Sequence, residues 1–324
     1  MISTHYLIIG NGIAGFQAAK SIRKHDDENS IYIVDKENYP TYMRTQLSYA
    51  LGDGREIDDL YVEKGNAFKD LNVNEILGKS VKVIDVNNNK VILDDDSSIS
   101  YKKLLIASGA KSFIPPYEKK EEARVFQLRT YDDLLNIRKE LDNIDKIVVS
   151  GGGLLGLELA DALLKQGKEV HVVELSEYIL NKQLDRETSE RLKKDLEELG
   201  FIIHTGISIK EVYKDKVVLS NGEEIKTDAL IFSVGIRSNL DIVPKEIRTN
   251  RAIIVDDSLS TNIDNIWACG DCVEIDGRTF GLWTASNEMG KIAGSNMTGE
   301  DKEYHVKSLF TNLNLGKIEV YSVG

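Results

Sequence analysis

The 324-residue sequence has only two cysteines and five histidines, and it has no long hydrophobic run. Two cysteines cannot build a disulfide framework, so we expect a reduced, cytoplasmic protein. The histidines are scattered without ligand spacing, which predicts that the chain holds no metal. The best candidate for a membrane span, residues 147–164, contains Glu158 and Asp161 and is not expected to cross a bilayer. The first residues lack a basic segment and a cleavage site, which argues against a secretory signal peptide.

Positive charge is also in short supply, because 41 Lys and Arg face 53 Asp and Glu, for a net charge of −12 at pH 7. Such a charge disfavours nucleic acid and anionic membranes as partners. A protein partner stays open, since an acidic chain can carry a local basic patch. The length predicts two domains, each large enough to bury a hydrophobic core.

The chain contains an internal near-repeat. Each copy has an apolar strand, a glycine-rich loop, a helix, and a second strand that ends in an acidic residue. The loops read Gly10-Asn11-Gly12-Ile13-Ala14-Gly15 and Gly151-Gly152-Gly153-Leu154-Leu155-Gly156, and the second strands end at Asp35 and Glu174. We expect the helices to run from these loops to about residues 24 and 166.

Three short strand-like runs follow each copy, at residues 81–85, 90–93 and 99–106 and at residues 211–213, 216–219 and 224–232. Each set closes on a glycine, in Ala107-Ser108-Gly109 and in Ser233-Val234-Gly235. Coincidence does not comfortably explain two matches in the same order. The pattern predicts an α/β fold of two Rossmann-like domains, each a parallel sheet with an antiparallel three-stranded excursion.

Both loops have the context of a dinucleotide-binding fingerprint, G-x-G-x-x-G between a strand and a helix. The first glycine allows a tight turn, the second lets the backbone approach a pyrophosphate, and the third lets helix and strand pack closely. The helix N-terminus offers N–H groups to the phosphates. Glu174 would bind the ribose 2′-hydroxyl and repel a 2′-phosphate, which favours NADH over NADPH. In the first copy Asp35 holds this place, and Glu37 is a second candidate.

A third motif runs from Thr261 to Asp271 and ends Ala268-Cys269-Gly270-Asp271. Together, the two fingerprints, the two glycine-ended strands and this run resemble the two-dinucleotide-binding flavoproteins, the pyridine-nucleotide flavin oxidoreductases, over about residues 5–299. The resemblance implies that the first fingerprint binds FAD and that an inserted second domain binds NADH. It also implies that Asp271 binds the flavin ribityl chain and that a helix N-terminus near residues 281–286 lies against the flavin pyrimidine edge.

One segment narrows the resemblance to a branch. Tyr42-Met43-Arg44-Thr45-Gln46-Leu47-Ser48 is similar to the Tyr-x-Arg-x-x-Leu-Ser signature of rubredoxin reductases, the flavin module of nitrite reductases and apoptosis-inducing factor. The resemblance implies that Arg44 and Arg129 contact FAD and that Glu158 lies near the flavin–nicotinamide contact. Many relatives carry a Lys where this chain has Tyr49, a departure that bears on the charge around the flavin.

The motifs and the resemblance together give the predicted cofactor-binding residues. They are Gly10, Gly12, Ile13, Ala14, Gly15, Asp35, Lys36, Glu37, Arg44, Val81, Ala107, Ser108, Gly109, Arg129, Gly151, Gly153, Leu154, Leu155, Gly156, Glu174, Gly235, Gly270, Asp271, Trp283, Thr284 and Ala285. Glu158 is predicted to position nicotinamide and flavin, and no nucleophile is expected.

A missing thiol decides between branches of this family. Disulfide reductases need a reactive cysteine pair after the first strand–helix–strand unit, and coenzyme A-linked members need a single cysteine there. Residues 35–60 contain no cysteine. Cys269 and Cys272 lie inside the ribityl motif and are expected to be small buried thiols. The electrons then have to leave from the flavin, to a one-electron carrier or to oxygen.

The sequence therefore predicts an FAD-dependent NADH oxidoreductase that feeds a small one-electron carrier, with rubredoxin as the leading candidate. The alternatives are an NADH oxidase, the electron-input module of a nitrite reductase, and an apoptosis-inducing-factor-like NADH-sensing switch. The expected domains are an FAD-binding domain at residues 1–106 and 236–306 and an NADH-binding domain at residues 107–235. Residues 307–324 are expected to begin a C-terminal α+β interface domain, which relatives often use to form a homodimer.

Overall fold

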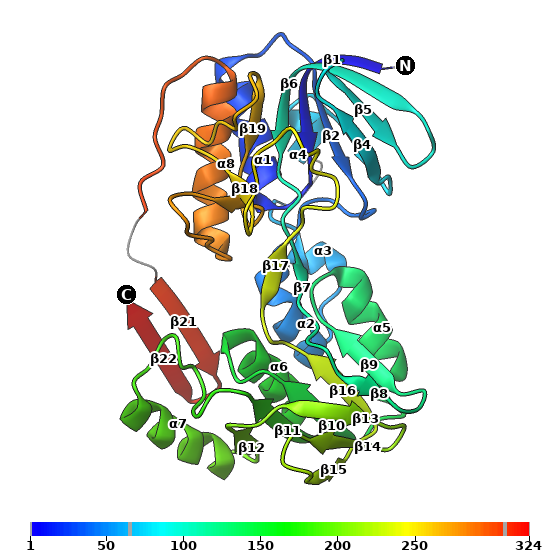
Figure 1. Ribbon diagram of the computed structural model, residues 1–324, viewed down its shortest axis with the longest axis vertical. Coiled ribbons are helices and arrows are strands. Elements are labelled where there is room, and N and C mark those ends of the chain that lie inside the picture. Colours follow the sequence, from blue (N-terminus) through cyan, green and yellow to red (C-terminus); the bar gives the residue numbers. More distant parts are fainter. Residues whose placement is uncertain (1, 64–66, 307–309, 324) are drawn as a thin grey trace. The chain divides into compact units, whose positions relative to one another are not determined.

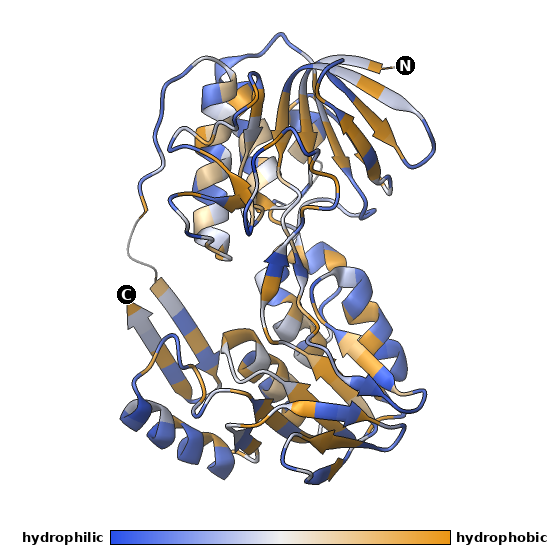
Figure 2. Ribbon diagram, in the orientation of Figure 1, coloured by the Kyte–Doolittle hydropathy of each residue, from blue (hydrophilic) through white to orange (hydrophobic). Residues whose placement is uncertain are grey.

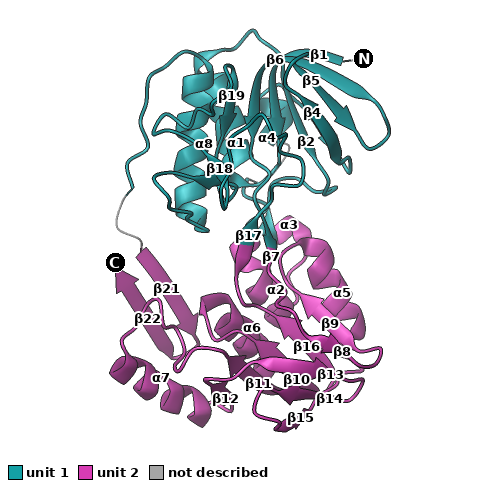
Figure 3. Cartoon of the chain, viewed as in Figure 1, with its two compact units in different colours: residues 1–43, 60–111, 237–306 teal, residues 44–59, 112–236, 307–324 magenta. Residues whose placement is uncertain are grey.

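The computed structural model describes residues 2–63, 67–306 and 310–323, and the chain forms two compact units (Figure 1, Figure 3). Unit 1 comprises residues 1–43, 60–111 and 237–306, and unit 2 comprises residues 44–59, 112–236 and 307–324. Residues 44–59, which the predicted limits place in the FAD-binding domain, pack within unit 2. Within the described ranges, every helix is too short or too polar to cross a membrane.

Unit 1 is built on a seven-stranded sheet of order β3-β2-β1-β6-β5-β4, with β19 also paired to β6. The strands β1, β2, β3, β6 and β19 pair in parallel, whereas β4 and β5 add an antiparallel excursion. The strands are β1 (Ile2–Ile9), β2 (Ile31–Asp35), β3 (Val73–Leu77), β4 (Val81–Asp85), β5 (Lys90–Leu93), β6 (Ser98–Ile106) and β19 (Ile266–Ala268). Because residues 6–9 of β1 and residues 104–106 of β6 are apolar and buried on both faces, they lie at the centre of the sheet.

Helices α1 (Ile13–His25) and α8 (Trp283–Met297) of unit 1 pack closely against each other. A Cβ atom on Gly290 would lie 2.2 Å from the backbone oxygen of Ala14, and one on Gly294 would lie 2.4 Å from that of Ala18. The small residues at this helix pair therefore fix how near the two axes come. The remaining elements of unit 1 are α4 (Ala67–Asp70), β18 (Ile253–Ile254) and β20 (Val273–Glu274).

Unit 2 has a five-stranded parallel sheet of order β12-β11-β10-β16-β9 and a four-stranded sheet of order β15-β14-β13-β8. The strands are β8 (Glu118–Lys119), β9 (Arg124–Gln127), β10 (Lys146–Ser150), β11 (Glu169–Glu174), β12 (Ile202–Thr205), β13 (Ile209–Val212), β14 (Lys216–Leu219), β15 (Glu224–Lys226) and β16 (Ala229–Phe232). Two further strands, β21 (Phe310–Leu315) and β22 (Ile318–Val323), form an antiparallel hairpin. Strands β7 (Ala110–Ser112) and β17 (Ile236–Ser238) pair where the chain passes between the units.

The helical elements of unit 2 are η1 (Arg44–Gln46), α2 (Leu47–Asp53), α5 (Tyr131–Leu141), α6 (Leu154–Lys165) and α7 (Arg186–Glu198), and α3 (Ile57–Leu60) ends at its boundary. Figure 2 shows hydrophobic residues concentrated on the strands, while α7 is mainly hydrophilic. Side chains cap α5 and α7 at their N-termini, where Thr130 accepts from the Asp133 N–H and Asp185 accepts from the Thr188 N–H.

The predicted fold class is confirmed, since both units contain the Rossmann-type parallel sheet. One strand assignment is wrong, because the run at residues 224–232 is two strands. The break falls at Thr227, whose hydroxyl donates to the backbone oxygens of Lys146 and Ala229 at 3.1 and 2.7 Å. Strand β15 of the four-stranded sheet ends there, and β16 enters the parallel sheet.

Candidate dinucleotide-binding sites

In the first glycine loop, two of the three glycines are required by the protein itself. Gly10 has φ of +108°, and a Cβ on it would lie 2.1 Å from the Ala107 backbone oxygen. A Cβ on Gly15 would lie 2.0 Å from the Gly10 oxygen. Gly12 is different, because it has an ordinary φ of −77° and nothing lies within 4 Å of its Cβ position. The chain alone therefore gives no reason for a glycine at residue 12.

The second loop repeats this arrangement. Gly151 has φ of +121° and faces the Ser233 backbone oxygen at 2.3 Å from its Cβ position. A Cβ on Gly156 would lie 2.0 Å from the Gly151 oxygen, whereas Gly153, with φ of −83°, has open space. In both loops the second glycine leaves room that only a molecule outside the chain would fill, as a pyrophosphate would.

The helices that follow these loops lack the side-chain caps that α5 and α7 have. Gly12 and Gly153 are the N-cap residues of α1 and α6, neither has a side-chain acceptor, and neither first turn contains an acidic residue. By contrast, Thr130 and Asp185 cap α5 and α7. The first N–H groups of α1 and α6 therefore remain available for an anion.

The strand-end acids brace both loops in the same way. Asp35 accepts from the N–H of Asn11 at 2.5 Å and from that of Glu37 at 2.8 Å. Glu174 accepts from the N–H of Gly152 at 2.6 Å and from that of Ser176 at 2.7 Å. Asp35 is thus the structural counterpart of Glu174.

The second ribose candidate of the first copy is also close by. Glu37 is 8% exposed, and its carboxylate accepts from the Tyr42 hydroxyl at 2.7 Å. Lys36 lies between the two acids in sequence and is exposed. The geometry keeps Asp35 and Glu37 together beside the loop.

The late glycine-aspartate motif lies next to the first loop in unit 1. Gly270, with φ of +84°, faces Ala14, whose Cβ lies 3.0 Å from the Cβ position of the glycine. Asp271 accepts from the Ser286 hydroxyl of α8 at 3.1 Å, and its backbone oxygen accepts from the Ser238 hydroxyl at 2.8 Å. Three predicted segments of unit 1, the loop, this motif and the start of α8, are therefore neighbours.

Two buried polar atoms near these segments have no hydrogen-bond partner among the described residues. They are the indole Nε1 of Trp283, the first residue of α8, and the side-chain Oδ1 of Asn239. Asn239 lies beside the closing glycine of the first copy, because its N–H donates to the Gly109 oxygen at 2.9 Å. The α8 N-terminus also lacks a side-chain cap and an acidic first turn. A polar ligand such as a flavin nucleotide would satisfy these groups.

The remaining predicted residues occupy several positions. Arg44 donates to the backbone oxygen of Arg129 at 3.2 Å, so the two predicted arginines meet in unit 2. Val81 is the first residue of β4 and pairs with Leu93. Gly235 has φ of +110° and accepts from the Phe113 N–H at 2.9 Å.

Glu158 of α6 has a partner that the sequence did not identify. Its Oε1 accepts from the Tyr49 hydroxyl of α2 at 3.1 Å. Burial raises the pKa of Glu158 to about 7, Asp161 adds to the rise, and the bond from Tyr49 opposes it. Tyr49 was recognisable only as a departure from the branch pattern, because no spacing rule links two residues this far apart in sequence.

The two thiols have no exposed surface. Cys269 and Cys272 are 0% exposed, and burial raises the pKa of both. Cys272 donates to the backbone oxygen of Ile106 at 3.4 Å and to that of Cys269 at 3.2 Å. The expected burial is confirmed, and thiols in this state are poor nucleophiles.

The model of the pyridine nucleotide-disulphide oxidoreductase family matches residues 4–290. An NADH-rubredoxin oxidoreductase of Clostridium acetobutylicum is 36% identical, over 100% of this chain and 82% of that protein. Its crystal structure matches with a TM-score of 0.85 and 33% identity, over 98% of this chain and 81% of that one. A nitrite reductase (NAD(P)H) of Bacillus subtilis is 32% identical, over 98% of this chain and 40% of that protein.

These matches agree with what the geometry requires of a ligand. The N-termini of α1 and α6 have no side-chain cap, and each follows a glycine, Gly12 or Gly153, whose Cβ position meets no protein atom. This arrangement suits the binding of two dinucleotides. The cofactors of the family are FAD and NADH. The chain thus belongs to the pyridine nucleotide-disulphide oxidoreductase family, as an FAD-dependent NAD(P)H oxidoreductase.

Proposed function

We propose that the chain oxidises NADH and passes the electrons singly to a small redox protein, with rubredoxin as the leading acceptor. The likeness to an NADH-rubredoxin oxidoreductase over the whole chain supports this acceptor. The observation that carries the route is the complete burial of Cys269 and Cys272, the two cysteines of the sequence. Because neither thiol can relay electrons, the electrons have to pass to the acceptor from the flavin itself.

For FAD we assign the site in unit 1. The open space at Gly12 and the N-terminus of α1 suit the pyrophosphate, and Asp35 or Glu37 suits the ribose. Asp271 suits the ribityl chain. The start of α8, with Trp283, Thr284 and Ala285, suits the flavin edge, and the unpartnered Nε1 of Trp283 supports this assignment. Arg44 and Arg129 are assigned to FAD by the branch resemblance alone.

For NADH we assign the site in unit 2. The open space at Gly153 and the N-terminus of α6 suit the pyrophosphate. The carboxylate of Glu174 suits the ribose hydroxyls and would repel a 2′-phosphate. Glu158, four residues after Leu154 at the start of α6, suits a role beside the nicotinamide.

The cofactor supplies the hydride chemistry, because bound flavin takes a hydride from NADH and can release the two electrons one at a time. The protein binds and orients both nucleotides, and its charges bias the transfer. None of these tasks needs a nucleophile, in keeping with the buried thiols.

The test is NADH oxidation by the FAD-loaded protein, without oxygen, against a panel of acceptors. We expect rapid bleaching of oxidised rubredoxin, and a much slower rate with oxygen when air is admitted. A small disulfide substrate is the control acceptor, and it should not be reduced because no thiol relay is available.

Two results would reject the proposal. In one, oxygen accounts for the full NADH rate and no small redox protein accelerates it, which identifies an NADH oxidase. In the other, turnover is slow with every acceptor and a reduced flavin–NAD complex persists, which favours the NADH-sensing switch.

A further inference from the structure

We propose that Tyr49 is a positioning residue that holds the Glu158 carboxyl by a hydrogen bond, and that NADH oxidation requires this carboxyl in its ionised form. The proposal rests on the proposed function, since it gives Glu158 a place beside the nicotinamide. It adds Tyr49 as a hydrogen-bond partner of Glu158, and it states that loss of the Glu158 carboxyl proton activates NADH oxidation.

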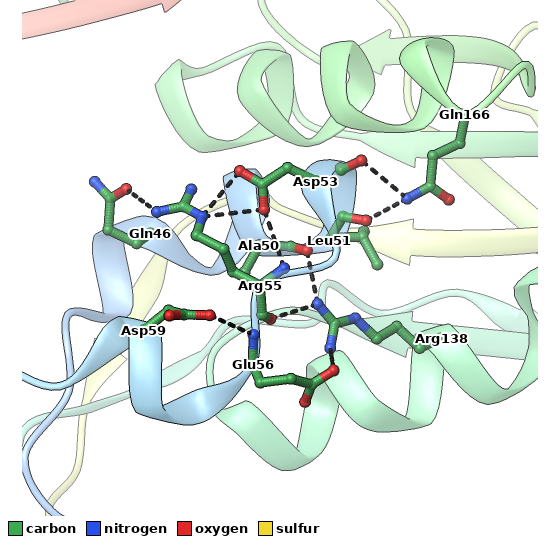
Figure 4. A network of polar contacts seen from close by, with 10 residues as sticks. Gln46, Ala50, Leu51, Asp53, Arg55, Glu56, Asp59, Arg138 and Gln166 are labelled. Atoms are coloured by element: carbon green, nitrogen blue, oxygen red, sulfur yellow. Dashed lines mark hydrogen bonds and ion pairs between the residues drawn. The ribbon is translucent and has the colours of Figure 1, made fainter.

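Helix α2 is held against α6 and α5 by contacts that do not involve Tyr49. A Cβ on Gly52 would lie 3.1 Å from the Cβ of Ala162, so the two helices touch. Gln166 donates to the backbone oxygen of Leu51 (Figure 4). Arg138 of α5 donates to the backbone oxygens of Ala50 and Arg55, and both of these bonds are 2.7 Å long. The position of Tyr49 is therefore fixed by its helix, and loss of its hydroxyl should leave the helix in place.

The surroundings of Glu158 disfavour its charge. The groups within the described chain that act on its ionisation are the Tyr49 hydroxyl and Asp161, and neither is a cation. Asp161 is itself paired with Lys165 at 2.6 Å. Because partial burial and Asp161 both disfavour the charge of Glu158, the hydroxyl of Tyr49 is what stabilises its carboxylate.

The same pair has a clear order of ionisation. Burial, with Glu158 nearby, raises the pKa of Tyr49 to about 12, although Arg55 opposes the rise. The pKa of Glu158 is about 7. Tyr49 therefore stays a donor throughout the working range, while Glu158 changes charge near neutral pH.

The charge matters because of what hydride transfer does to NADH. The hydride carries away an electron pair, so the nicotinamide ring becomes cationic as NADH turns into NAD⁺. A carboxylate nearby stabilises this developing charge, whereas a neutral carboxyl does not. The rate of hydride transfer should therefore rise as pH passes through about 7.

The experiment combines flavin reduction by NADH, followed by stopped flow across pH, with NMR titration of the apoprotein labelled with carboxyl ¹³C-glutamate. Glu158→Gln identifies the Glu158 signal and should abolish the inflection in the rate. In Tyr49→Phe we expect the inflection and the NMR titration to move up together by about one pH unit. That shift lowers the rate at pH 6 by about tenfold and leaves it almost unchanged at pH 9. Tyr49→Lys should move both downward, because an ammonium favours the carboxylate more strongly.

The matched control is Tyr213→Phe, which removes a similar hydroxyl bond, 2.8 Å to Glu211, on the four-stranded sheet of unit 2. It should move neither the rate profile nor the Glu158 signal. The proposal is overturned if Tyr49→Phe leaves the Glu158 titration where it is in wild type, or moves it without moving the rate. An absence of NADH oxidation at any pH would instead reject the proposed function, while the titration of the apoprotein would still report on the pair.

Discussion

At the scale of single residues, the partly buried Glu158 makes the free energy of unfolding depend on pH. Its pKa is raised from 4.5 to about 7, mainly by burial. Between these values the unfolded chain loses the proton while the folded chain keeps it, so folding becomes less favourable as pH rises through this window. The cost above pH 7 is at most about 3 kcal/mol.

Glu158→Gln should therefore stabilise the apoprotein, and its advantage over wild type should grow by about 2 kcal/mol between pH 5 and pH 8. Thermal or urea unfolding at the two pH values measures this difference. Glu211→Gln is the control, because the bond from Tyr213 lowers the pKa of Glu211 and no such gain is expected. An equal advantage at both pH values would show that Glu158 titrates normally.

A second prediction concerns Glu174 and Leu175 and the choice between NADH and NADPH. Wild type should prefer NADH by at least about tenfold in kcat/KM, about 1.4 kcal/mol, because of the carboxylate at residue 174. Leu175 is 72% exposed, so Glu174→Gln with Leu175→Arg replaces the repelling charge by an attracting one. The ratio should move towards NADPH.

The glutamine in this variant keeps an acceptor for the loop N–H groups that Glu174 braces. Leu199→Arg adds the same charge at another exposed leucine of unit 2 and should leave the ratio unchanged. If wild type uses both nucleotides equally, Glu174 does not select the cofactor.

Residues at fixed spacings could be predicted from the sequence, whereas partners brought together by docking could not. Asp35 and Glu174 follow from the strand–loop–helix pattern, and both brace their loops. Tyr49 and Glu158 meet because α2 lies on α6, and no local preference of either helix indicates that contact.

At the scale of elements, different glycines of each loop are expected to serve folding and nucleotide binding. Gly15→Ala places a Cβ 2.0 Å from a backbone oxygen and should destabilise unit 1 by several kcal/mol. Gly12→Ala meets nothing in the protein and should fold as wild type does, yet retain FAD poorly. Unfolding curves of the apoprotein and the flavin content after purification measure the two effects.

In the second loop, Gly153→Ala and Gly156→Ala form the corresponding pair. Gly153→Ala should keep FAD and stability but raise the KM for NADH. Retention of normal NADH binding by Gly153→Ala would mean that the open space at this residue does not face the nucleotide.

The helices and most of the strand runs that the repeat predicted lie within a residue or two of the observed elements, whereas elements outside the repeat, such as α5 and α7, were not predicted. The first helix ends at His25 and the second at Lys165, close to the expected residues 24 and 166. The division of residues 224–232 was missed because both halves are β-type, and only the hydroxyl of Thr227 marks where the chain changes sheets. Hydrophobic periodicity carries no information about which sheet a strand joins.

At the scale of the whole molecule, the thiols should be dispensable for electron transfer. Blocking reagents should leave NADH oxidation intact, because Cys269 and Cys272 are fully buried in unit 1. Cys269→Ser with Cys272→Ser should at most lower FAD retention, which the absorbance of the purified protein measures. A double variant that keeps its flavin but passes no electrons to the acceptor would show that the pair is redox-active.

The docking of residues 44–59 into unit 2 has a consequence for synthesis. Leu47 and Leu51 of α2 are buried, and α2 packs against α6, which begins more than a hundred residues later in the chain. At about 5–20 residues per second, the ribosome completes α2 several seconds before α6 emerges. During that interval α6 is not yet available to pack against α2. The nascent chain therefore exposes a hydrophobic segment that chaperones can bind. Synthesis of unit 2 thus begins early in the chain and ends late, and most strands of the unit 1 sheet are synthesised between its first segment and the rest.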